Sequence, residues 1–351
     1  MTTISSLVRK HIRDLVPYSS ARDEFTGSAE IYLDANENSI GSVLKEGLNR
    51  YPDPLQKQLK QIISQTKNIA SNRIFIGNGS DEAIDLLIRA FCEPGVEKMI
   101  VMPPTYGMYA VSAAINNVES VEIPLTTEFN IELPAVLSHL DEKIKLIFIC
   151  SPNNPTANLM KREAIESILN SARGLVIIDE AYIDFSDSDS LIPWLKRYNN
   201  LVILQTFSKA WGLANIRLGI ALANPDVVDV LNRIKPPYNV SGVTQQAVID
   251  SLAKAGLVNR MVEEIKSQKI RLVNALNSLN CVEKVFPSDA NFILVRFIDA
   301  IRIFNALINS GIIVRDRTKA LNCENCLRIT VGKPTENKKL IDLLKKLDHV
   351  Q

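Results

Sequence analysis

The chain has 351 residues, 46% of them hydrophobic and 23% charged, and its 40 Lys and Arg balance 39 Asp and Glu to a net charge of +1. This balance excludes the strongly positive surface of a nucleic-acid-binding protein, and 14 Gly and 16 Pro are too few for a fibrous or low-complexity chain. The length allows two domains, or one large domain with an appendage, each able to bury a core.

The chain opens with an amphipathic segment, MTTISSLVRKHIRDLV. This segment lacks the apolar core and the small-residue cleavage site of a signal peptide. No uninterrupted apolar run in the sequence approaches the length of a membrane span. We therefore expect a cytoplasmic protein with no membrane partner.

From residue 73 onward, short β-rich runs alternate with stretches of helical period. Strand and helix are predicted in turn at 73–77 and 80–91, 98–102 and 105–115, and 145–150 and 160–172, followed by strands at 175–179, 201–207 and 216–223. These strands are nearly continuous in apolar residues, which is typical of strands buried on both faces. The pattern predicts an α/β fold in which a large, mostly parallel sheet is sandwiched by helices.

The pattern changes after the turn at 236–238. A long helical tract at about 243–279 leads to three runs that favour strands, VEKVF, NFILVRF and LRITVG, and to helices near 299–310 and 335–348. We expect a large domain at 31–245, preceded by a separate segment at 1–30. Residues 246–351 then form a linking helix and a smaller α+β domain.

Cysteine usage favours a reducing compartment, because the number is odd and the spacings are irregular: Cys92, Cys150, Cys281, Cys323 and Cys326. Only Cys323 and Cys326 have a redox or half-zinc spacing. No second such pair completes a metal site. We interpret these two residues as ordinary thiols at the edge of a strand and expect no metal.

The loops that follow the predicted strands carry the candidate chemistry, because ligands of parallel sheets bind at the carboxyl ends of the strands. In IFIGNGSDEAIDLL, a Gly loop opens directly into a helix, and Ser80 is a suitable N-cap. The backbone N–H groups of Ser80, Asp81 and Glu82 form an anion site. Glu82 stands where a dinucleotide fingerprint requires a small residue, so we expect the phosphate of a different ligand.

Two later loops add side chains that suit a planar ligand. Tyr106 in PPTYGMY either lies flat on a planar ring or is a core aromatic residue. In CSPNNPTA, the prolines fix a rigid loop from which Asn153 and Asn154 project, although a purely structural turn is also consistent with the motif.

The strand at 175–179 ends in Asp179, three residues before Tyr182. A carboxylate at this position either caps the following turn or meets a cation, such as a protonated ring nitrogen. Lys209 follows the strand at 201–207 and lies among Thr206, Ser208 and Arg217. The hydroxyls and the guanidinium suit a phosphate, and the neighbouring cation lowers the pKa of the lysine amine towards nucleophilic activity.

Taken together, these loops provide what a planar pyridine with a phosphate, a phenolic oxygen and an aldehyde requires. The sequence resembles the fold-type I pyridoxal-phosphate aminotransferases, and within them the class II histidinol-phosphate aminotransferases. The resemblance spans nearly the whole chain in order, through LDANEN, RYPDP, PPTYGMY, CSPNNPT, DEAYIDF, TFSKAWGLANIRLG, GIIVRD and CLRITVG. The sequence departs from most relatives at Ala157, where Gly is usual, and at Trp211 and Gly212, where Phe-Ala is common.

The resemblance implies pyridoxal 5'-phosphate as cofactor. Lys209 would join it covalently and then shuttle the proton, Asp179 would keep the pyridine nitrogen protonated, and Tyr106 would stack on the ring. Asn154 and Tyr182 would hydrogen-bond the phenolic oxygen. The phosphate would be held by Ser80, Asp81, Thr206, Ser208 and Arg217, and by Tyr51 of a second subunit.

For the substrate, the resemblance implies Arg328, Arg315, Asn154 and Tyr18 as binding residues. The protein would be a homodimer with shared active sites, in which residues 1–30 join the small domain and the dimer partner. Its reaction would be a ping-pong transamination in histidine biosynthesis, between histidinol phosphate with 2-oxoglutarate and imidazole acetol phosphate with glutamate. A surface ion pair with Asp316 is an equally acceptable interpretation of Arg315.

Two other functions remain open at the level of sequence. An aromatic amino-acid aminotransferase or a threonine-phosphate decarboxylase would use the same scaffold and most of the same motifs. A nucleotide-binding regulatory module built on the GNGSDE loop would make Lys209 incidental.

Overall fold

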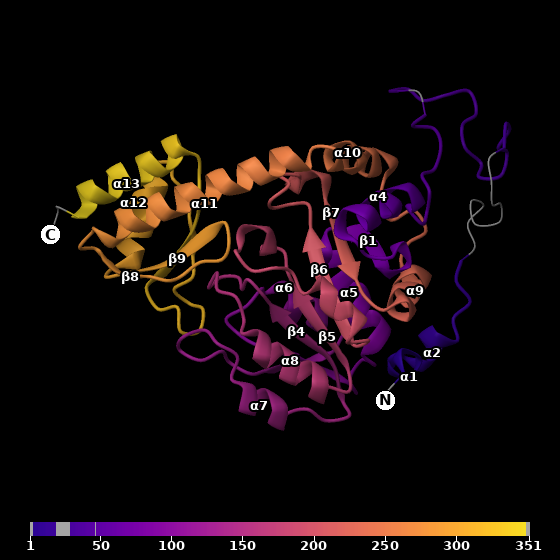
Figure 1. Ribbon diagram of the computed structural model, residues 1–351, viewed down its shortest axis with the longest axis horizontal. Helices are drawn as coiled ribbons and strands as arrows, with labels where there is room; N and C mark the ends of the chain where they lie inside the picture. The colour runs from indigo at the N-terminus through magenta and orange to yellow at the C-terminus, as the bar shows by residue number, and fades with distance from the viewer. Residues whose placement is uncertain (1–2, 19–28, 46, 349–351) are drawn as a thin grey trace.

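The computed structural model describes residues 3–18, 29–45 and 47–348. Its centre is a seven-stranded sheet with the order β1-β7-β6-β5-β4-β2-β3 (Figure 1). The strands are β1 (Ile74–Asn78), β2 (Lys98–Val101), β3 (Glu119–Glu122), β4 (Ile144–Cys150), β5 (Leu175–Asp179), β6 (Leu201–Thr206) and β7 (Leu218–Leu222). The predicted α/β class with a mostly parallel sheet is confirmed.

Strand β7 runs against its neighbours, pairing antiparallel with both β1 and β6, whereas β2 to β6 pair in parallel. The reason is the short connection from β6 to β7, which contains only the single 3-10 turn η4 (Ala214–Ile216) and no crossover helix. The chain therefore returns along β6, and the loop that carries Lys209 bends sharply at the end of that strand.

Both faces of the sheet are buried under helices. In β5, Val176 and Ile178 belong to one core cluster, while Leu175 and Ile177 belong to the other. The first cluster also contains side chains of α4 (Lys57–Lys67), α7 (Leu133–Ser138), α8 (Arg162–Ser171) and α10 (Gly242–Leu252). The second contains side chains of α5 (Ser80–Phe91), α6 (Met108–Ile115) and α9 (Pro225–Ile234).

A second, antiparallel sheet has the order β10-β11-β9-β8, with β8 (Val282–Val285), β9 (Phe292–Phe297), β10 (Arg315–Asp316) and β11 (Cys326–Thr330). It forms a separate core with α11 (Ala255–Asn277), α12 (Ala300–Asn309) and α13 (Pro334–Asp348). Figure 1 shows α11 running from α10, beside the large sheet, to this smaller sheet. The predicted α+β unit is confirmed, but the tract at 243–279 is two helices rather than one.

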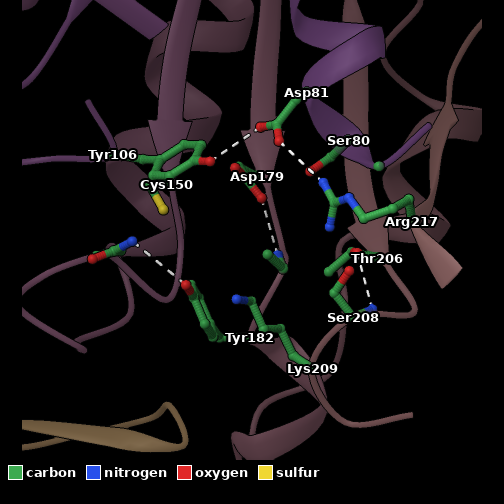
Figure 2. Close-up of a pocket in the computed structure, with 13 residues that line it drawn as sticks. Ser80, Asp81, Tyr106, Cys150, Asp179, Tyr182, Thr206, Ser208, Lys209 and Arg217 are labelled. Carbon is green, nitrogen blue, oxygen red and sulfur yellow. Dashed lines mark hydrogen bonds and ion pairs between the residues drawn. The ribbon is translucent and has the colours of Figure 1, made fainter. Parts of the chain in front are cut away.

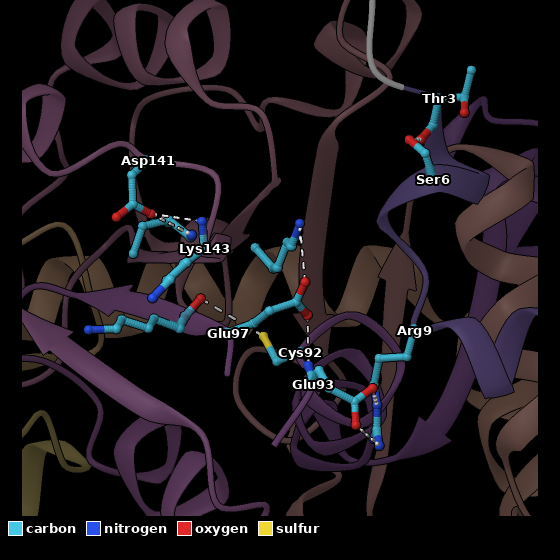
Figure 3. Close-up of polar contacts among 11 residues, drawn as sticks. Thr3, Ser6, Arg9, Cys92, Glu93, Glu97, Asp141 and Lys143 are labelled. Atoms are coloured by element: carbon cyan, nitrogen blue, oxygen red, sulfur yellow. Dashed lines mark hydrogen bonds and ion pairs between the residues drawn. The ribbon is translucent and has the colours of Figure 1, made fainter. Parts of the chain in front are cut away.

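The amino-terminal residues pack on the large sheet's layer of helices. Helices α1 (Ile4–Leu7) and α2 (Lys10–Arg13) contact α9. Between them, Arg9 donates from Nε and Nη2 to the two carboxylate oxygens of Glu93, at 3.1 and 3.2 Å, and from Nη1 to the carbonyl of Arg89 at 2.8 Å (Figure 3). This paired geometry is the strong form of an arginine–carboxylate contact, and it fixes the segment next to the end of α5.

Three further 3-10 turns complete the described elements: η1 (Ser71–Arg73), η2 (Ile183–Phe185) and η3 (Ile192–Lys196). None of the helices in the described part of the chain combines the length and the apolar character needed to cross a membrane.

Candidate active site

A pocket of about 140 Å³ opens where β4, β5 and β6 end, beside the first residues of α5 (Figure 2). A cavity of this size can enclose a single six-membered ring. Ten of the predicted site residues line it: Ser80, Asp81, Tyr106, Asn154, Asp179, Tyr182, Thr206, Ser208, Lys209 and Arg217. The other lining residues, Gly79, Cys150 and Ala181, were not among the predicted site residues.

The amino end of α5 forms one wall of the pocket. The prediction that Ser80 is the N-cap is wrong by one residue: Gly79, with φ +73°, holds that position, and no side chain caps the helix. Gly79 has no side chain that could cap the helix, and the nearby carboxylate of Glu82 accepts the N–H of Asn78, which precedes the helix, at 2.5 Å. The first turn of α5 therefore has no side-chain acceptor for its N–H groups, which suits an anion.

Glu82 also explains why the Gly loop differs from a dinucleotide site. A Cβ atom on Gly77 would lie 2.9 Å from Glu82 Oε2, so the carboxylate occupies the space beside the loop. The same oxygen accepts Asn239 Nδ2 at 3.0 Å, which fixes it there. A closely approaching pyrophosphate would meet this negative charge, so the loop suits a single phosphate better.

Arg217 provides the cation next to this wall. The backbone of Arg217 is left-handed, with φ +57°. Its Nη2 atom lies 3.6 Å from Asp81 Oδ2. A Cβ atom on Gly79 would lie 2.9 Å from the same Nη2, so a side chain there would displace the guanidinium from this position. On the other side, the hydroxyl of Thr206 accepts the N–H of Ser208 at 3.1 Å. The guanidinium, the hydroxyls and the helix end together form a cradle for a phosphate.

Asp179 lies at the bottom of the pocket and is 3% exposed. Its Oδ1 accepts the N–H of Ala181 at 3.0 Å, and its Oδ2 accepts the hydroxyl of Tyr109 at 2.7 Å. Burial raises the pKa of Asp179, while these two hydrogen bonds and Lys209 act in the opposite direction. The two sequence interpretations are thus compatible, because the carboxylate caps the turn with one oxygen and still lines the pocket.

Lys209 follows β6, and its amine points into the pocket towards Tyr182 (Figure 2). The amine lies 5.5 Å from the centre of the Tyr182 ring. Burial lowers the pKa of Lys209, and the positive charges of Arg328 and Arg217 lower it further. A lysine in this environment holds more of its neutral, nucleophilic form than a surface lysine does.

Tyr106 lines the pocket and is only partly buried, so the core-aromatic interpretation is wrong for this residue. Its hydroxyl donates to Asp81 Oδ1 at 3.1 Å. The core aromatic residue is Tyr109, one helical turn later, whose ring lies edge-on to Tyr106 at 5.5 Å. Tyr106 lies just before α6 and Tyr109 lies in its first turn, and no pattern in the sequence identified Tyr109 as the buried one of the two.

Asn154 connects the pocket to the smaller sheet. Its Nδ2 donates to the Tyr182 hydroxyl at 3.4 Å, and its Oδ1 accepts Nη1 of Arg328 at 2.5 Å. Arg328 comes from β11 and lies over the ring of Phe292, 5.2 Å from its centre. Arg315, its cross-strand neighbour on β10, is exposed, and Asp316 accepts the N–H of Thr318 at 2.8 Å.

Four predicted residues do not line this pocket: Arg315 and Arg328 lie on the smaller sheet, and Tyr51 and Tyr18 precede α4. Tyr51 is 52% exposed and stacks on Tyr238, with ring centres 4.5 Å apart. Tyr18 is 74% exposed. The fold thus gathers the residues that follow strands and leaves out those that precede α4.

Comparison with known proteins relates nearly the whole chain to one family. The family model described as "Aminotransferase class I and II" matches residues 28–344. A histidinol-phosphate aminotransferase of Cytophaga hutchinsonii is 49% identical over 343 residues, which are 98% of this chain and 99% of that protein.

Two solved structures superpose on this fold. The histidinol-phosphate aminotransferase of Clostridium acetobutylicum has a TM-score of 0.80 at 25% identity, covering 87% of this chain and 92% of that one. The enzyme of the same name from Sinorhizobium meliloti, solved in complex with pyridoxal-5'-phosphate, has a TM-score of 0.77 at 22% identity, covering 89% and 90%.

Proposed function

Because this chain belongs to the class I and II aminotransferase family, we propose that it is a pyridoxal-phosphate-dependent histidinol-phosphate transaminase. It exchanges an amino group between histidinol phosphate with 2-oxoglutarate and imidazole acetol phosphate with glutamate, a reaction of histidine biosynthesis. The full-length similarity to relatives of that name supports the choice of substrate. The observation that carries the proposal is one pocket containing a lysine amine, a buried carboxylate and a phosphate cradle.

The donor set of this pocket fits pyridoxal 5'-phosphate. The buried carboxylate of Asp179 is costly beside a pocket that offers no closely paired cation, and a protonated ring nitrogen would offset that cost. The α5 terminus, Arg217 and the hydroxyls of Thr206 and Ser208 would hold the phosphate. When bound, the cofactor supplies the electron-withdrawing ring that stabilises a carbanion at the substrate carbon.

The remaining pocket residues orient the ring and move the proton. Tyr106 provides a flat aromatic wall, and Asn154 and Tyr182 provide hydrogen-bonding groups for a phenolic oxygen. The Nζ atom of Lys209 is the base, because its lowered pKa leaves a neutral amine available to take a proton from the amino-bearing carbon.

Two guanidiniums of the smaller sheet are available for the substrate anions, Arg328 beside the pocket residue Asn154 and Arg315 on the neighbouring strand. Arg328 contacts Asn154 and is half-buried, so we assign it to the anion nearest the reacting carbon. Arg315, on the next strand, extends the positive surface towards solvent and suits the dianionic phosphate of histidinol phosphate.

The protein is proposed to act as a homodimer with shared active sites, in the cytoplasm. Residues 29–45 extend away from the body of the chain (Figure 1) and expose apolar side chains: Ile31, Leu33, Ile40, Val43 and Leu44. Such a surface suits a second copy, whose pocket Tyr51 and Tyr18 would then reach. All five cysteines are unpaired thiols, which agrees with a reducing compartment.

A panel of amino donors tests the proposed activity. Purified protein with pyridoxal 5'-phosphate and 2-oxoglutarate should turn over histidinol phosphate with a kcat/KM at least about 100-fold above that of phenylalanine, tyrosine or threonine phosphate, because polar recognition discriminates strongly. Glutamate formation is the measurement. Release of carbon dioxide from threonine phosphate, or preference for an aromatic amino acid, would contradict the substrate assignment.

The Lys209→Ala variant is the control for the chemistry. It should lose about 10³-fold in kcat, since the general base is removed, and the visible absorbance of the reconstituted protein should change. Cofactor that remains attached to a different residue after borohydride reduction would contradict the assignment of Lys209.

A further inference from the structure

A second, fully buried tyrosine lies directly behind the carboxylate of the pocket. Tyr109 has 0% exposure, and its hydroxyl donates to Asp179 Oδ2 at 2.7 Å. Its ring is stacked on Phe148 of β4, with centres 4.8 Å apart and planes at 20°. The ring therefore cannot swing away without opening the packed core, so the hydroxyl is held on Asp179.

The Tyr109 hydroxyl and a backbone N–H group each donate to a different oxygen of the Asp179 carboxylate. Asp179 Oδ1 accepts the N–H of Ala181, so each oxygen receives one hydrogen bond from the protein. A carboxylate can accept about four, which leaves capacity facing the pocket. The orientation of the carboxylate is thus fixed before any ligand arrives.

Because Asp179 is buried, its ionisation depends on the two hydrogen-bond donors, the Tyr109 hydroxyl and the N–H of Ala181. Burial raises the pKa of Asp179, and the hydrogen bonds from Tyr109 and from the N–H of Ala181 are the next largest influences, both lowering it. The titratable groups that interact with it come from several elements: Tyr109, Cys150, Asp81, Lys209, Tyr106 and Tyr182. Lys209 is the cation among the largest influences on this pKa, and its effect is smaller than that of the Tyr109 hydroxyl.

We propose that Tyr109 is a positioning residue that keeps Asp179 ionised and aimed at its cationic partner in the pocket. This inference rests on the proposed function, because that partner is the protonated ring nitrogen of pyridoxal 5'-phosphate. The alternative is a purely structural role, in which the Tyr109 hydroxyl only supplies a hydrogen bond to a buried carboxylate. The two roles differ in what the loss of the hydroxyl does to cofactor binding and turnover.

The test is Tyr109→Phe, which keeps the ring and its stacking on Phe148. Titration of the apo-protein with pyridoxal 5'-phosphate should give an affinity about 10-fold weaker than wild type, the effect of one hydrogen bond to a charged group. The kcat should fall while KM changes little, and the absorbance of the bound cofactor should shift. In an Asp179→Asn background, Tyr109→Phe should add little further loss of affinity.

Stability of the apo-protein gives a second measurement that needs no cofactor. A carboxyl whose pKa is raised by folding stabilises the fold below its unfolded pKa, and that stability is lost as the pH rises through the folded pKa. Removing the Tyr109 hydroxyl raises the folded pKa of Asp179 further. Tyr109→Phe should therefore lose more stability at about pH 8 than at about pH 5 in urea unfolding.

Tyr198→Phe is the matched control, because Tyr198 also donates to a carboxylate, Glu166 Oε1, at 2.6 Å, but on the surface. It should leave affinity, kcat and absorbance unchanged. If Tyr109→Phe folds poorly, Phe148→Leu, which loosens the same ring, should weaken cofactor binding in the same direction.

The inference is overturned if Tyr109→Phe, or Phe148→Leu in its place, binds the cofactor and turns over like wild type. Failure of wild-type protein to bind pyridoxal 5'-phosphate would instead contradict the proposed function, so the two failures are distinguishable.

Discussion

Lys209 follows a strand of the large sheet and Arg328 lies on the smaller sheet, yet the charge of Arg328 acts on the Lys209 amine. Burial is the main influence that lowers the pKa of each side chain. For Lys209 the next influence is the charge of Arg328. A residue assigned to substrate binding therefore also helps to keep the lysine amine neutral.

This coupling predicts the effect of Arg328→Gln on the apo-protein. Loss of the positive neighbour favours protonated Lys209, so its pKa rises and its amine reacts more slowly near neutral pH. Reductive methylation at a series of pH values, with peptide mass spectrometry at Lys209, measures this change. Arg315→Gln is the matched control, because the charge of Arg315 is not one of the largest influences on the pKa of Lys209. Equal slowing by both variants would contradict the coupling.

At the residue scale, the sequence predicted the pocket side chains that follow strands, but not the buried residues that hold those side chains in position. Asp179 was identifiable because a buried strand ending in a carboxylate is unusual, and Lys209 because it follows a buried strand among hydroxyls and close to Arg217. Tyr109 was not, since its hydrogen bond depends on how α6 packs against β5. Ala157 is fully buried with φ +68°, which explains why glycine is usual there, although the sequence alone could not give its conformation.

At the element scale, the junction of β1, β7 and α5 positions the phosphate cradle. Gly219 of β7 pairs with Gly77 of β1, and the backbone of α5 begins directly beside it. A Cβ atom on Gly219 would lie 2.2 Å from the backbone nitrogen of Ser80. The two segments are distant in sequence, so their close approach had no local signal.

Gly219→Ala should therefore destabilise the protein by about 3 kcal/mol, at the upper end of what overpacking costs, because only backbone can give way. It should also weaken cofactor binding, since the α5 terminus must move. Gly256→Ala, at a helical site with nothing within 4 Å of the added Cβ, should instead stabilise by up to about 1 kcal/mol. Urea unfolding measures both, and a shift of the same sign and size in the two variants would contradict the clash.

Element prediction succeeded where hydrophobic period and chain breaks agreed. Helix α5 spans the predicted residues 80–91, whereas α10 and α11 were merged because the break at 253–254 contains neither Pro nor Gly. Strand β10 has two residues, too few for any alternation to be visible. Its pairing with β11 nevertheless sets the position of Arg315.

At the scale of the whole molecule, the proposed sharing of sites makes a prediction about mixtures of variants. If Tyr51 acts on the pocket of a second copy, Lys209→Ala and Tyr51→Ala subunits combine into dimers that contain one intact site. Random reassociation should then restore about a quarter of wild-type activity, since half of the dimers are mixed and each has one native site of two.

The measurement is transamination after the two inactive proteins are mixed, unfolded mildly and refolded together, at limiting cofactor. Lys209→Ala mixed with Asp179→Ala is the control and should stay inactive, because both residues line the pocket of one chain. If the mixture of Lys209→Ala and Tyr51→Ala recovers no activity, Tyr51 does not act on the pocket of a second subunit, and the proposed sharing of sites is contradicted.

The contact between Arg328 and Asn154 links the two sheets across the pocket entrance, and the same amide faces the Tyr182 hydroxyl. Any displacement of β11 relative to the large sheet would therefore pull on Asn154, and through it on the hydrogen bond to Tyr182 in the pocket.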